Sequence, residues 1–384
     1  MFIDHLIIGA GISGSYIAHQ LNKKGQSFLV LEKDTIDRGK QYTINYTVDD
    51  QVVNIELGSS VIHSKQETIL ELLKELNLHT TPLPKNEKAV YIYPGYTFEK
   101  AKEKYKALRK KLKESASNYP SYFTVEDLAR EIFDKLDYEF FKWCMDAWYE
   151  YNDQNAITYF DSVKNEGEYL YISEGMEYML KKISLPFLDK IQFNTEVKSV
   201  EKSNEGYIVK TDKDIYNAKK LYICVNLRSA KKIEYIKLEN VSRYLNLGLS
   251  KECLRVYVVL NKRLDIEYGS ISGKFLSKWT LRITDKVWMV TYTDGILANK
   301  LENMEIKELI RTWIDDMNNL FNKDLTFNDV VYYVSGYWDD AYAVLSKEFY
   351  KGSKVKLPDN LMITSLPKGK GENTAWIEGH LYKI

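Results

Sequence analysis

Three glycines near the amino end, Gly9, Gly11 and Gly14, have the spacing G-x-G-x-x-G. The apolar run "HLIIG" precedes them, "ISGSYIAHQL" follows with helical spacing, and "SFLVLE" is a second β-rich run. This order of strand, glycine turn, helix and strand is typical of a dinucleotide-binding site. The glycines permit a tight turn and a close approach of backbone to a pyrophosphate, which the helix N-terminus can bind.

The second β-rich run ends in Glu32, where a carboxylate can accept hydrogen bonds from the hydroxyls of a ribose. An acid there disfavours a 2′-phosphate, so we expect the dinucleotide not to be NADP. The alternative is a glycine-rich turn without a ligand. The flanking strands and the acid make this the weaker interpretation.

The residues after Glu32 resemble the flavin amine oxidase family, in which the acid is followed by G-G-R-x-x-T. In "EKDTIDRGKQYT", Gly39 and Thr43 match that motif. Arg38 stands at the first glycine, and Lys40 keeps the positive charge of the family's arginine. That arginine lies near the flavin's phosphate and ribityl chain. The resemblance therefore implies that the dinucleotide is FAD.

Further segments resemble the same family. "IELGSSVIH" (residues 55–63) is similar to its D-L-G-A-S-W-I-H, whose glycine and serine, here Gly58 and Ser59, bring backbone against the isoalloxazine ring. The alternative for this segment is a β-turn beside an amphipathic helix. "YISEGMEYMLKKI" is similar to a glycine-containing helix start, and "NLMITSLPKGKGENTAWIEGHLYKI" to the segment that closes the flavin site. The resemblance covers residues 1–85, 165–235 and 330–384.

The resemblance implies a set of cofactor contacts along these segments. Val197 would hold the adenosine through its backbone. At the end of the last strand, the family usually binds the ribityl chain through an acid or the backbone, and this chain has Ser365 there. Ala341 stands where some members have a cysteine bonded to the flavin, so we expect non-covalent FAD. The expected contacts are Gly9, Gly11, Ile12, Ser13, Gly14, Glu32, Lys33, Gly39, Lys40, Gly58, Ser59, Ser60, Val197, Ser365, Trp376 and Ile377.

Family members also have two aromatic rings that stand perpendicular to the flavin and flank the path of the amine. The segments "YWDDAY" and "AWIEG" match those that carry the rings, which gives Tyr342 and Trp376. The alternative is ordinary core packing, because 13% of the residues are aromatic. We expect His63, at the end of "SSVIH", either to face the substrate or to hold the structure through a hydrogen bond.

Arg255 is the main departure from the family. Many members have a lysine, bridged by water to flavin N5, in the strand that "CLRVYVVLN" matches, and this chain has Arg255 there. Because arginine stays protonated, it cannot serve as a base near neutral pH. The substitution puts the family's usual oxygen chemistry in question. Lys251 and Lys262 are the candidates if the alignment is shifted.

The strand and helix patterns place these residues in an α/β fold with an α+β substrate region. We expect a Rossmann-like, GR2-type FAD-binding domain of residues 1–85, 166–238 and 326–384. It would be interleaved with a substrate domain of mixed sheet plus helices, residues 86–165 and 239–325. In the helical part, Thr124 with Asp127 indicates a capping box. The basic run "KALRKKLK" is interpreted as a solvated helix face rather than a nucleic-acid patch.

Composition limits the partners and the compartment. The 384 residues include 54 basic and 54 acidic side chains, so the net charge gives no support for nucleic-acid binding. The sequence shows no apolar run long enough for a membrane span and no signal peptide. Three widely spaced cysteines fit a reducing compartment. We therefore expect a cytoplasmic protein.

Together these features predict an FAD-dependent oxidoreductase that resembles amine oxidases. It would oxidise a monoamine, a polyamine or an amino acid by hydride transfer to flavin N5, and O2 or another acceptor would take the electrons. One alternative is a related dehydrogenase or desaturase that acts on a non-amine substrate. Another is a binding or structural protein that retains the fold. The sequence predicts no metal site and leaves a homodimer open.

Overall fold

The first of two large sheets contains the amino-terminal strands. A computed structural model describes residues 2–35, 39–82, 88–162 and 168–366. Strands β1 (Phe2–Ile8) and β2 (Phe28–Leu31) are parallel neighbours, and β12 (Ile215–Ile223) lies parallel on the other side of β1. The other strands are β9 (Ile191–Gln192), β10 (Val197–Ser203), β11 (Gly206–Thr211), β13 (Glu234–Ile236) and β19 (Leu361–Ile363). The order is β13-β10-β11-β12-β1-β2-β9, with β19 paired to β12.

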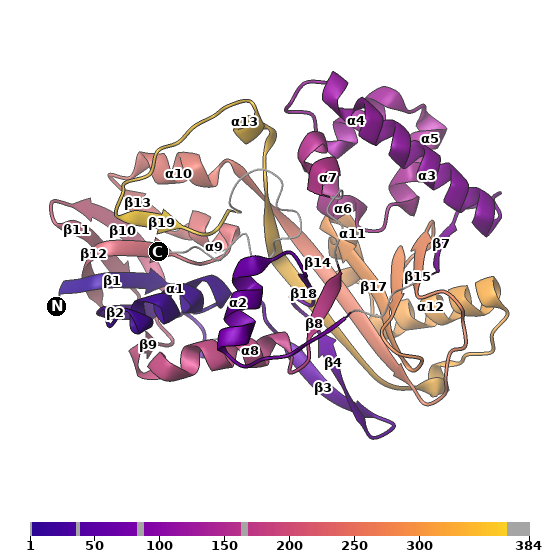
Figure 1. Cartoon of the computed structure of the whole chain (residues 1–384), viewed down its shortest axis with the longest axis horizontal. Helices are drawn as coiled ribbons and strands as arrows, with labels where there is room; N and C mark the ends of the chain where they lie inside the picture. The colour runs from indigo at the N-terminus through magenta and orange to yellow at the C-terminus, as the bar shows by residue number, and fades with distance from the viewer. Residues whose placement is uncertain (1, 36–38, 83–87, 163–167, 367–384) are drawn as a thin grey trace.

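Both faces of this sheet are buried, as its apolar parallel strands require. Successive residues of β1 point to opposite faces, so Ile7 packs in one core cluster and Ile8 in the other. The elements on the first face are α1 (Ile12–Lys23), α2 (Glu67–Glu75) and α8 (Met176–Ser184), and those on the second are α9 (Leu227–Lys232) and α10 (Glu239–Leu245). This layered unit lies at the left of Figure 1, and its β1-α1-β2 order confirms the predicted Rossmann-like start.

The second sheet has the strand order β18-β14-β17-β16-β15-β7. Its strands are β7 (Ala89–Ile92), β14 (Gly248–Leu260), β15 (Ser270–Gly273), β16 (Trp279–Arg282), β17 (Val287–Asp294) and β18 (Val330–Leu345). Helices α11 (Gly295–Glu302) and α12 (Ile306–Phe321) pack on one face, where the rings of Trp288 and Trp313 lie 6.2 Å apart. The hairpin of β3 (Thr43–Val48) and β4 (Gln51–Glu56) packs on the other face.

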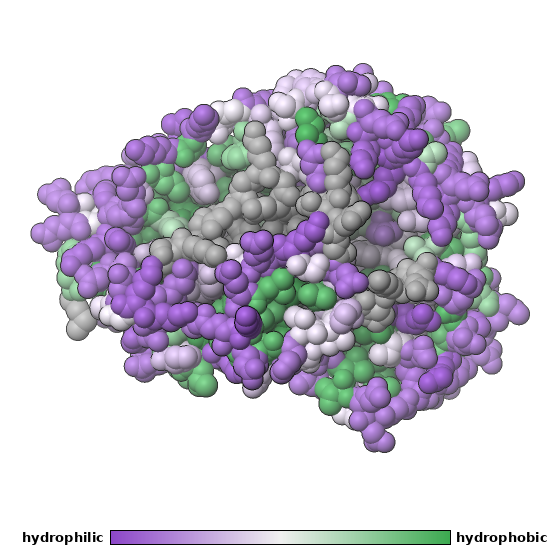
Figure 2. All heavy atoms as spheres, viewed as in Figure 1, coloured by the Kyte–Doolittle hydropathy of each residue, from purple (hydrophilic) through white to green (hydrophobic). Residues whose placement is uncertain are grey.

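A helical group with its own apolar core lies beside the second sheet, at the upper right of Figure 1. Its helices are α3 (Phe98–Ser115), α4 (Val125–Ile132), α5 (Lys135–Cys144), α6 (Trp148–Tyr151) and α7 (Ala156–Ser162). α5 starts as a helix separate from α4 because the Asp134 carboxylate accepts a hydrogen bond from the backbone N–H of Asp137. Hydrophilic side chains cover this group on the face shown in Figure 2.

Short elements complete the described structure. Strands β5 (Ile62–His63), β8 (Tyr169–Ile172) and β6 (Thr80–Pro82) form a small sheet in that order, and α13 (Lys347–Tyr350) follows β18. The expected boundaries between the two domains stay a prediction. β18 lies within the range assigned to the FAD-binding domain, yet it pairs with β14 in the second sheet. Within the described ranges, no helix is both long enough and apolar enough to cross a membrane.

The capping box predicted at Thr124 is present, so its removal should destabilise the helical group. The Thr124 hydroxyl accepts a hydrogen bond from the backbone N–H of Asp127 at 3.1 Å, and the Asp127 carboxylate accepts one from the N–H of Thr124 at 3.0 Å. Thr124→Ala should lower the free energy of unfolding by about 1 kcal/mol, measured by urea denaturation. Thr124→Ser, which keeps the hydroxyl, is the control. Equal losses in both variants would contradict the capping role.

Candidate active site

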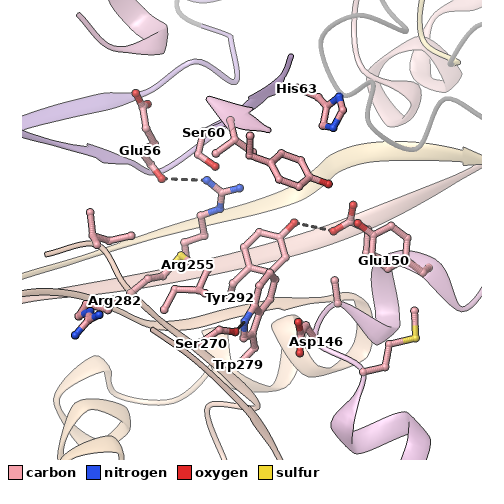
Figure 3. A pocket seen from close by; sticks show the side chains of 18 of the residues that line it. Glu56, Ser60, His63, Asp146, Glu150, Arg255, Ser270, Trp279, Arg282 and Tyr292 are labelled. Atoms are coloured by element: carbon pink, nitrogen blue, oxygen red, sulfur yellow. Dashed lines mark hydrogen bonds between the residues drawn. The ribbon is translucent and has the colours of Figure 1, made fainter. Parts of the chain in front are cut away.

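A cavity of about 830 Å³ lies between the second sheet, residues 54–63 and the helical group. Figure 3 shows side chains from these elements converging on it. Its aromatic wall is formed by Tyr91, Tyr105, Tyr151, Tyr159, Tyr169, Tyr171, Tyr257, Trp279 and Tyr292. Such a wall can enclose an apolar body, and the charged groups among the rings can orient its polar ends.

Arg255 occupies the wall on β14 and is 4% exposed. Its Nη1 donates to the carbonyl oxygen of Glu56 at 3.1 Å, and its guanidinium lies 4.9 Å from the ring centre of Tyr292. The hydroxyl of Tyr292 donates to Oε2 of Glu150 at 3.0 Å. These contacts run from β4 through Arg255 to α6 (Figure 3), so the carboxylate of Glu150 faces the charge of Arg255 across one ring.

A second acid lies near Glu150. Asp294, at the end of β17, is 1% exposed. Burial raises the pKa of Asp294 well above its usual range, and the negative charge of Glu150 adds to the shift. Burial next to the Glu150 carboxylate therefore disfavours the charged form of Asp294.

Asp146 is the third acidic group of this region and lines the cavity between α5 and α6. Its Oδ1 accepts a hydrogen bond from the hydroxyl of Ser272, and burial raises the pKa of Asp146. Lys278 fixes the preceding turn, because its Nζ donates to the carbonyls of Lys142 at 2.9 Å and Met145 at 2.9 Å. Burial lowers the pKa of Lys278 to about 8. The carbonyl contacts of Lys278 thus set the position from which Asp146 faces the cavity.

Glu56 ends β4 and bonds the start of α8. Its Oε1 accepts from the backbone N–H of Met176 at 3.0 Å, and its Oε2 accepts from the hydroxyl of Thr43 at 2.8 Å. Glu56 is 4% exposed, and burial raises the pKa of its carboxyl group to about 7. Glu56 is thus a structural acid whose backbone carbonyl also serves Arg255.

The predicted cofactor residues form a continuous path toward the cavity. The backbones of Gly11 and Gly39 lie so close that a Cβ on Gly39 would stand 3.0 Å from Cα of Gly11. Gly58 packs against the carbonyl of Lys40, where a Cβ would stand 1.8 Å from its oxygen, and the N–H of Ser59 donates to that oxygen at 3.1 Å. Ser59 and Ser60 then line the cavity. We call this path the cofactor groove.

The groove begins at the ends of β1 and β2. The Glu32 carboxylate accepts from the N–H of Ala10 at 2.7 Å and from that of Asp34 at 2.9 Å. The carbonyl of Glu32 accepts from the N–H of Thr195, two residues before Val197. These bonds place the segment before Val197 beside Glu32 and the glycine turn, at one end of the groove. Lys33 is exposed at this end, and Ile12 and Ser13 are buried in the first turn of α1.

The predicted catalytic residues are only partly brought together. Arg255 and His63 line the cavity, and the alternatives Lys251 and Lys262 are not among its described lining residues. Lys251 pairs with Asp153, and Lys262 pairs with Asp324 and Asp329. The nitrogen Nδ1 of His63 accepts from the N–H of Lys65 at 3.3 Å, which fits the structural alternative as well.

Two predicted positions, Tyr342 and Ser365, are not among the described residues that line the cavity. Tyr342 is buried in β18, opposite Lys251, and is not among the described side chains of the cavity wall. The hydroxyl of Ser365 donates to the carbonyl of Val225 at 2.7 Å. Trp376 and Ile377 lie outside the described residues, so their predicted roles stay predictions.

Sequence reasoning missed Asp146, Glu150 and the cationic side of α3 as cavity residues. The motif comparison gave no signal for them, because they lie in residues 86–165, where the resemblance is weak. The only signal was the run "KALRKKLK", which was interpreted as a solvated face. That interpretation is incomplete, because Lys106, Arg109, Lys110 and Lys113 border the cavity.

The pKa of Glu56 gives a pH dependence of stability. The folded state holds this proton up to about pH 7, whereas the unfolded chain releases it near the ordinary value of 4.5. The folded state thus binds more protons between these values, and stability falls as the pH rises through them. Replacing Glu56 with Gln should reduce the difference in free energy of unfolding between pH 5 and pH 7.5 by about 1–3 kcal/mol, measured by urea unfolding at both pH values. A variant with the wild-type slope would assign it to other groups.

Two protein families match the chain. "NAD(P)-binding Rossmann-like domain" matches residues 7–76, which include the glycine turn and Glu32. "Flavin containing amine oxidoreductase" matches residues 130–354, more than half of the chain. The second match includes Arg255 and the acids Asp146 and Glu150, so it extends over segments where the motifs were sparse.

Curated relatives match over a short stretch. Flavin-containing amine oxidase B of Sus scrofa is 33% identical over 95 residues, and amine oxidase A of the same species is 34% identical over 96 residues. These stretches cover 25% of this chain and 18% of each relative. The shared part is therefore less than a fifth of the length of these relatives.

Solved structures match over nearly the whole chain. Putrescine oxidase bound to putrescine has a TM-score of 0.76 at 18% identity, covering 99% of this chain and 98% of that one. Cyclohexylamine oxidase from Brevibacterium oxydans has a TM-score of 0.77 at 16% identity, covering 98% of this chain and 96% of that one. These likenesses establish the fold. With the family match over residues 130–354, they show that this chain belongs to the flavin-containing amine oxidoreductase family.

Proposed function

We propose that this protein is an FAD-dependent oxidoreductase that oxidises a small amine. The observation that carries the proposal is that the cofactor groove meets the aromatic cavity at Ser59 and Ser60. A flavin bound along the groove would reach the cavity where these residues line it. Such a chamber excludes water and presents one substrate to one reactive ring.

The groove residues fit FAD. Among the described residues, a Cβ on Gly11 would meet only Cα of Gly39, at 3.9 Å, so these residues leave space for a pyrophosphate in front of the turn. α1 begins at Gly11 without a side-chain cap, which leaves its first N–H groups for phosphate oxygens. Lys40 donates to the carbonyl of Ala341, and burial lowers the pKa of Lys40 to about 8. A nearby phosphate would supply the negative charge that this buried lysine favours.

The attachment of the cofactor is proposed to be non-covalent. Ala341 stands where the resemblance places the flavin-linking cysteine of some members, and alanine cannot form that bond. Cys144, Cys224 and Cys253 are all buried and unpaired. Burial raises the pKa of Cys224 to about 12, which keeps this thiol protonated and unreactive.

Bound flavin supplies an acceptor for two electrons and a hydrogen from the carbon that carries the amine nitrogen. The residues of this chain would prepare the substrate for that transfer. An amine must be neutral before it is oxidised, and Asp146 and Glu150 line the cavity as carboxyl groups able to take a proton from an ammonium. The aromatic wall would hold the carbon chain.

Molecular oxygen is the proposed acceptor, and one observation favours a second candidate. Arg255 is the cavity residue at the predicted lysine position, and arginine cannot release its proton there. A dehydrogenase or desaturase that acts on a non-amine substrate and passes electrons to another acceptor would not require that lysine. The cytoplasmic compartment is proposed from the sequence alone.

Two glycine variants test the cofactor assignment. Gly14→Ala would place a Cβ 1.9 Å from the oxygen of Gly9, and it should destabilise the protein by about 2–3 kcal/mol. Gly11 has φ of −69°, which alanine adopts, so Gly11→Ala should fold normally. It should nevertheless lose flavin absorbance after gel filtration, because the methyl group occupies the pyrophosphate approach. Full flavin content in Gly11→Ala would contradict the groove.

The reaction is tested by anaerobic mixing with amines. We expect purified protein to be yellow and to lose its colour with a substrate amine, with peroxide formed when air is readmitted. Arg255→Lys should recover its colour faster in air, since lysine can hold a water and exchange its proton. Unchanged reoxidation in Arg255→Lys would argue that Arg255 is not at the lysine position. A colourless protein that cannot be reconstituted with FAD would favour the binding-protein alternative.

A further inference from the structure

One side of α3 borders the cavity with four cationic residues. Lys106, Arg109, Lys110 and Lys113 have the spacing i, i+3, i+4 and i+7, which puts them on one side of the helix. We call these four residues the cationic rim. The opposite side of α3 includes Lys111, which is exposed and not among the described lining residues. The basic run is thus a solvated face on one side and a cavity border on the other.

Few carboxylates lie close to the rim, although the charge of Asp146 interacts with that of Arg109. Lys110 lies 3.7 Å from Glu114, and both side chains are exposed. For Lys106, Arg109 and Lys113, the described residues offer no carboxylate oxygen within 4 Å. Arg109 is held instead by a hydrogen bond with the Tyr159 hydroxyl. The hydrogen bond fixes the orientation of the guanidinium and leaves further N–H groups to donate. Such a group is suited to bind an oxyanion.

The rim lies at the end of the cavity away from the cofactor groove. The ring of Tyr105 on α3 contacts the ring of Tyr91 on β7, with 4.5 Å between the ring centres. β7 is the edge strand of the second sheet, whereas Arg255 is on β14, four positions away in the strand order. Arg255 bonds the segment that continues into Ser59 and Ser60. The cavity therefore has a flavin end at Arg255 and a distal end at α3.

The charge of the whole cavity agrees with this arrangement. Its described lining includes six lysine or arginine residues and three acids. Burial raises the pKa of Glu56 to about 7, so this acid contributes less negative charge near neutral pH, and burial also raises the pKa of Asp146. A positive lining attracts anions and repels a second cation on the substrate. A diamine would place its far ammonium at the rim.

We propose that the substrate is an amine whose far end carries an oxyanion, a carboxylate or a phosphate, held by Lys106, Arg109 and Lys113. The amine end would lie at the flavin end of the cavity, near Glu150 and Arg255. This inference rests on the proposed function, because it assigns the substrate class of the same site. It requires no new chemical step. The rim supplies affinity and orientation only.

The test compares four compounds of similar length that share one aminoalkyl group. They are pentylamine, 1,5-diaminopentane, 5-aminopentanoate and 3-aminopropyl phosphate. The flavin-loaded protein is titrated with each by calorimetry, and the rate constant of flavin reduction is measured by anaerobic bleaching of the flavin. We expect at least one of the two anionic compounds to bind about 10-fold tighter than pentylamine, and the diamine to bind most weakly. The carboxylate and phosphate arms identify which oxyanion the rim prefers.

Two double variants with the same change in net charge provide the control. Lys106→Gln with Lys113→Gln removes two exposed rim charges and should reduce the preference for the anionic compounds about 3- to 10-fold, with a weaker salt dependence. Lys100→Gln with Lys111→Gln removes two exposed lysines of α3 that are outside the described cavity lining, and should leave the preference intact. Thermal unfolding of both variants checks that α3 remains folded.

The outcomes separate this inference from the proposed function. If pentylamine or the diamine binds as tightly as both anionic compounds, or if the two double variants lose the preference equally, the oxyanion assignment is overturned. Bleaching by pentylamine in that case would leave amine oxidation standing. If the anionic compounds bind with the expected pattern and no amine bleaches the flavin, the rim assignment holds and the proposed reaction fails.

Discussion

The backbone of residues 56–59 must be satisfied by side chains of the second sheet and by the backbone of Lys40 at once, and the site depends on this constraint. Arg255 and Tyr257 donate to the carbonyl of Glu56, and Trp338 donates to that of Leu57 at 2.7 Å. On the other side, Gly58 packs against the carbonyl of Lys40, and the N–H of Ser59 donates a hydrogen bond to the same carbonyl. Because buried backbone groups without partners are costly, this segment is fixed where the cofactor groove meets the cavity.

The same constraint explains why a buried arginine can stand in the cavity wall. Its guanidinium is bonded to a carbonyl, lies against the ring of Tyr292, and faces the Glu150 carboxylate across that ring. Removing one partner of such a set leaves an uncompensated buried charge. The resulting loss of folding free energy is far larger than any stability that the complete set adds relative to an apolar wall. Arg255 therefore has a structural reason to remain charged. Any catalytic part it takes must use that permanent charge.

The polarity of the cavity follows from which elements close it. The hairpin β3–β4 and its continuation bring the polar backbone of the groove to one end, and α3 brings lysines and an arginine to the other. Between them, the aromatic wall contributes apolar surface with hydroxyl groups at its edges. A substrate with two different ends would thus have one orientation. Families that share a fold can differ in substrate through such differences at the cavity end.

The sequence alone determined the features that depend on neighbouring residues. The turn from β1 into α1, the position of Glu32 at the end of β2 and the capping box at Thr124 follow from local spacing, and the structure has them. Only the tertiary structure decided that β18 joins β14, that Arg255 meets the carbonyl of Glu56, and that one side of α3 faces the cavity. Local propensity cannot specify these contacts, because they join residues far apart in the chain and arise when separate apolar surfaces pack together.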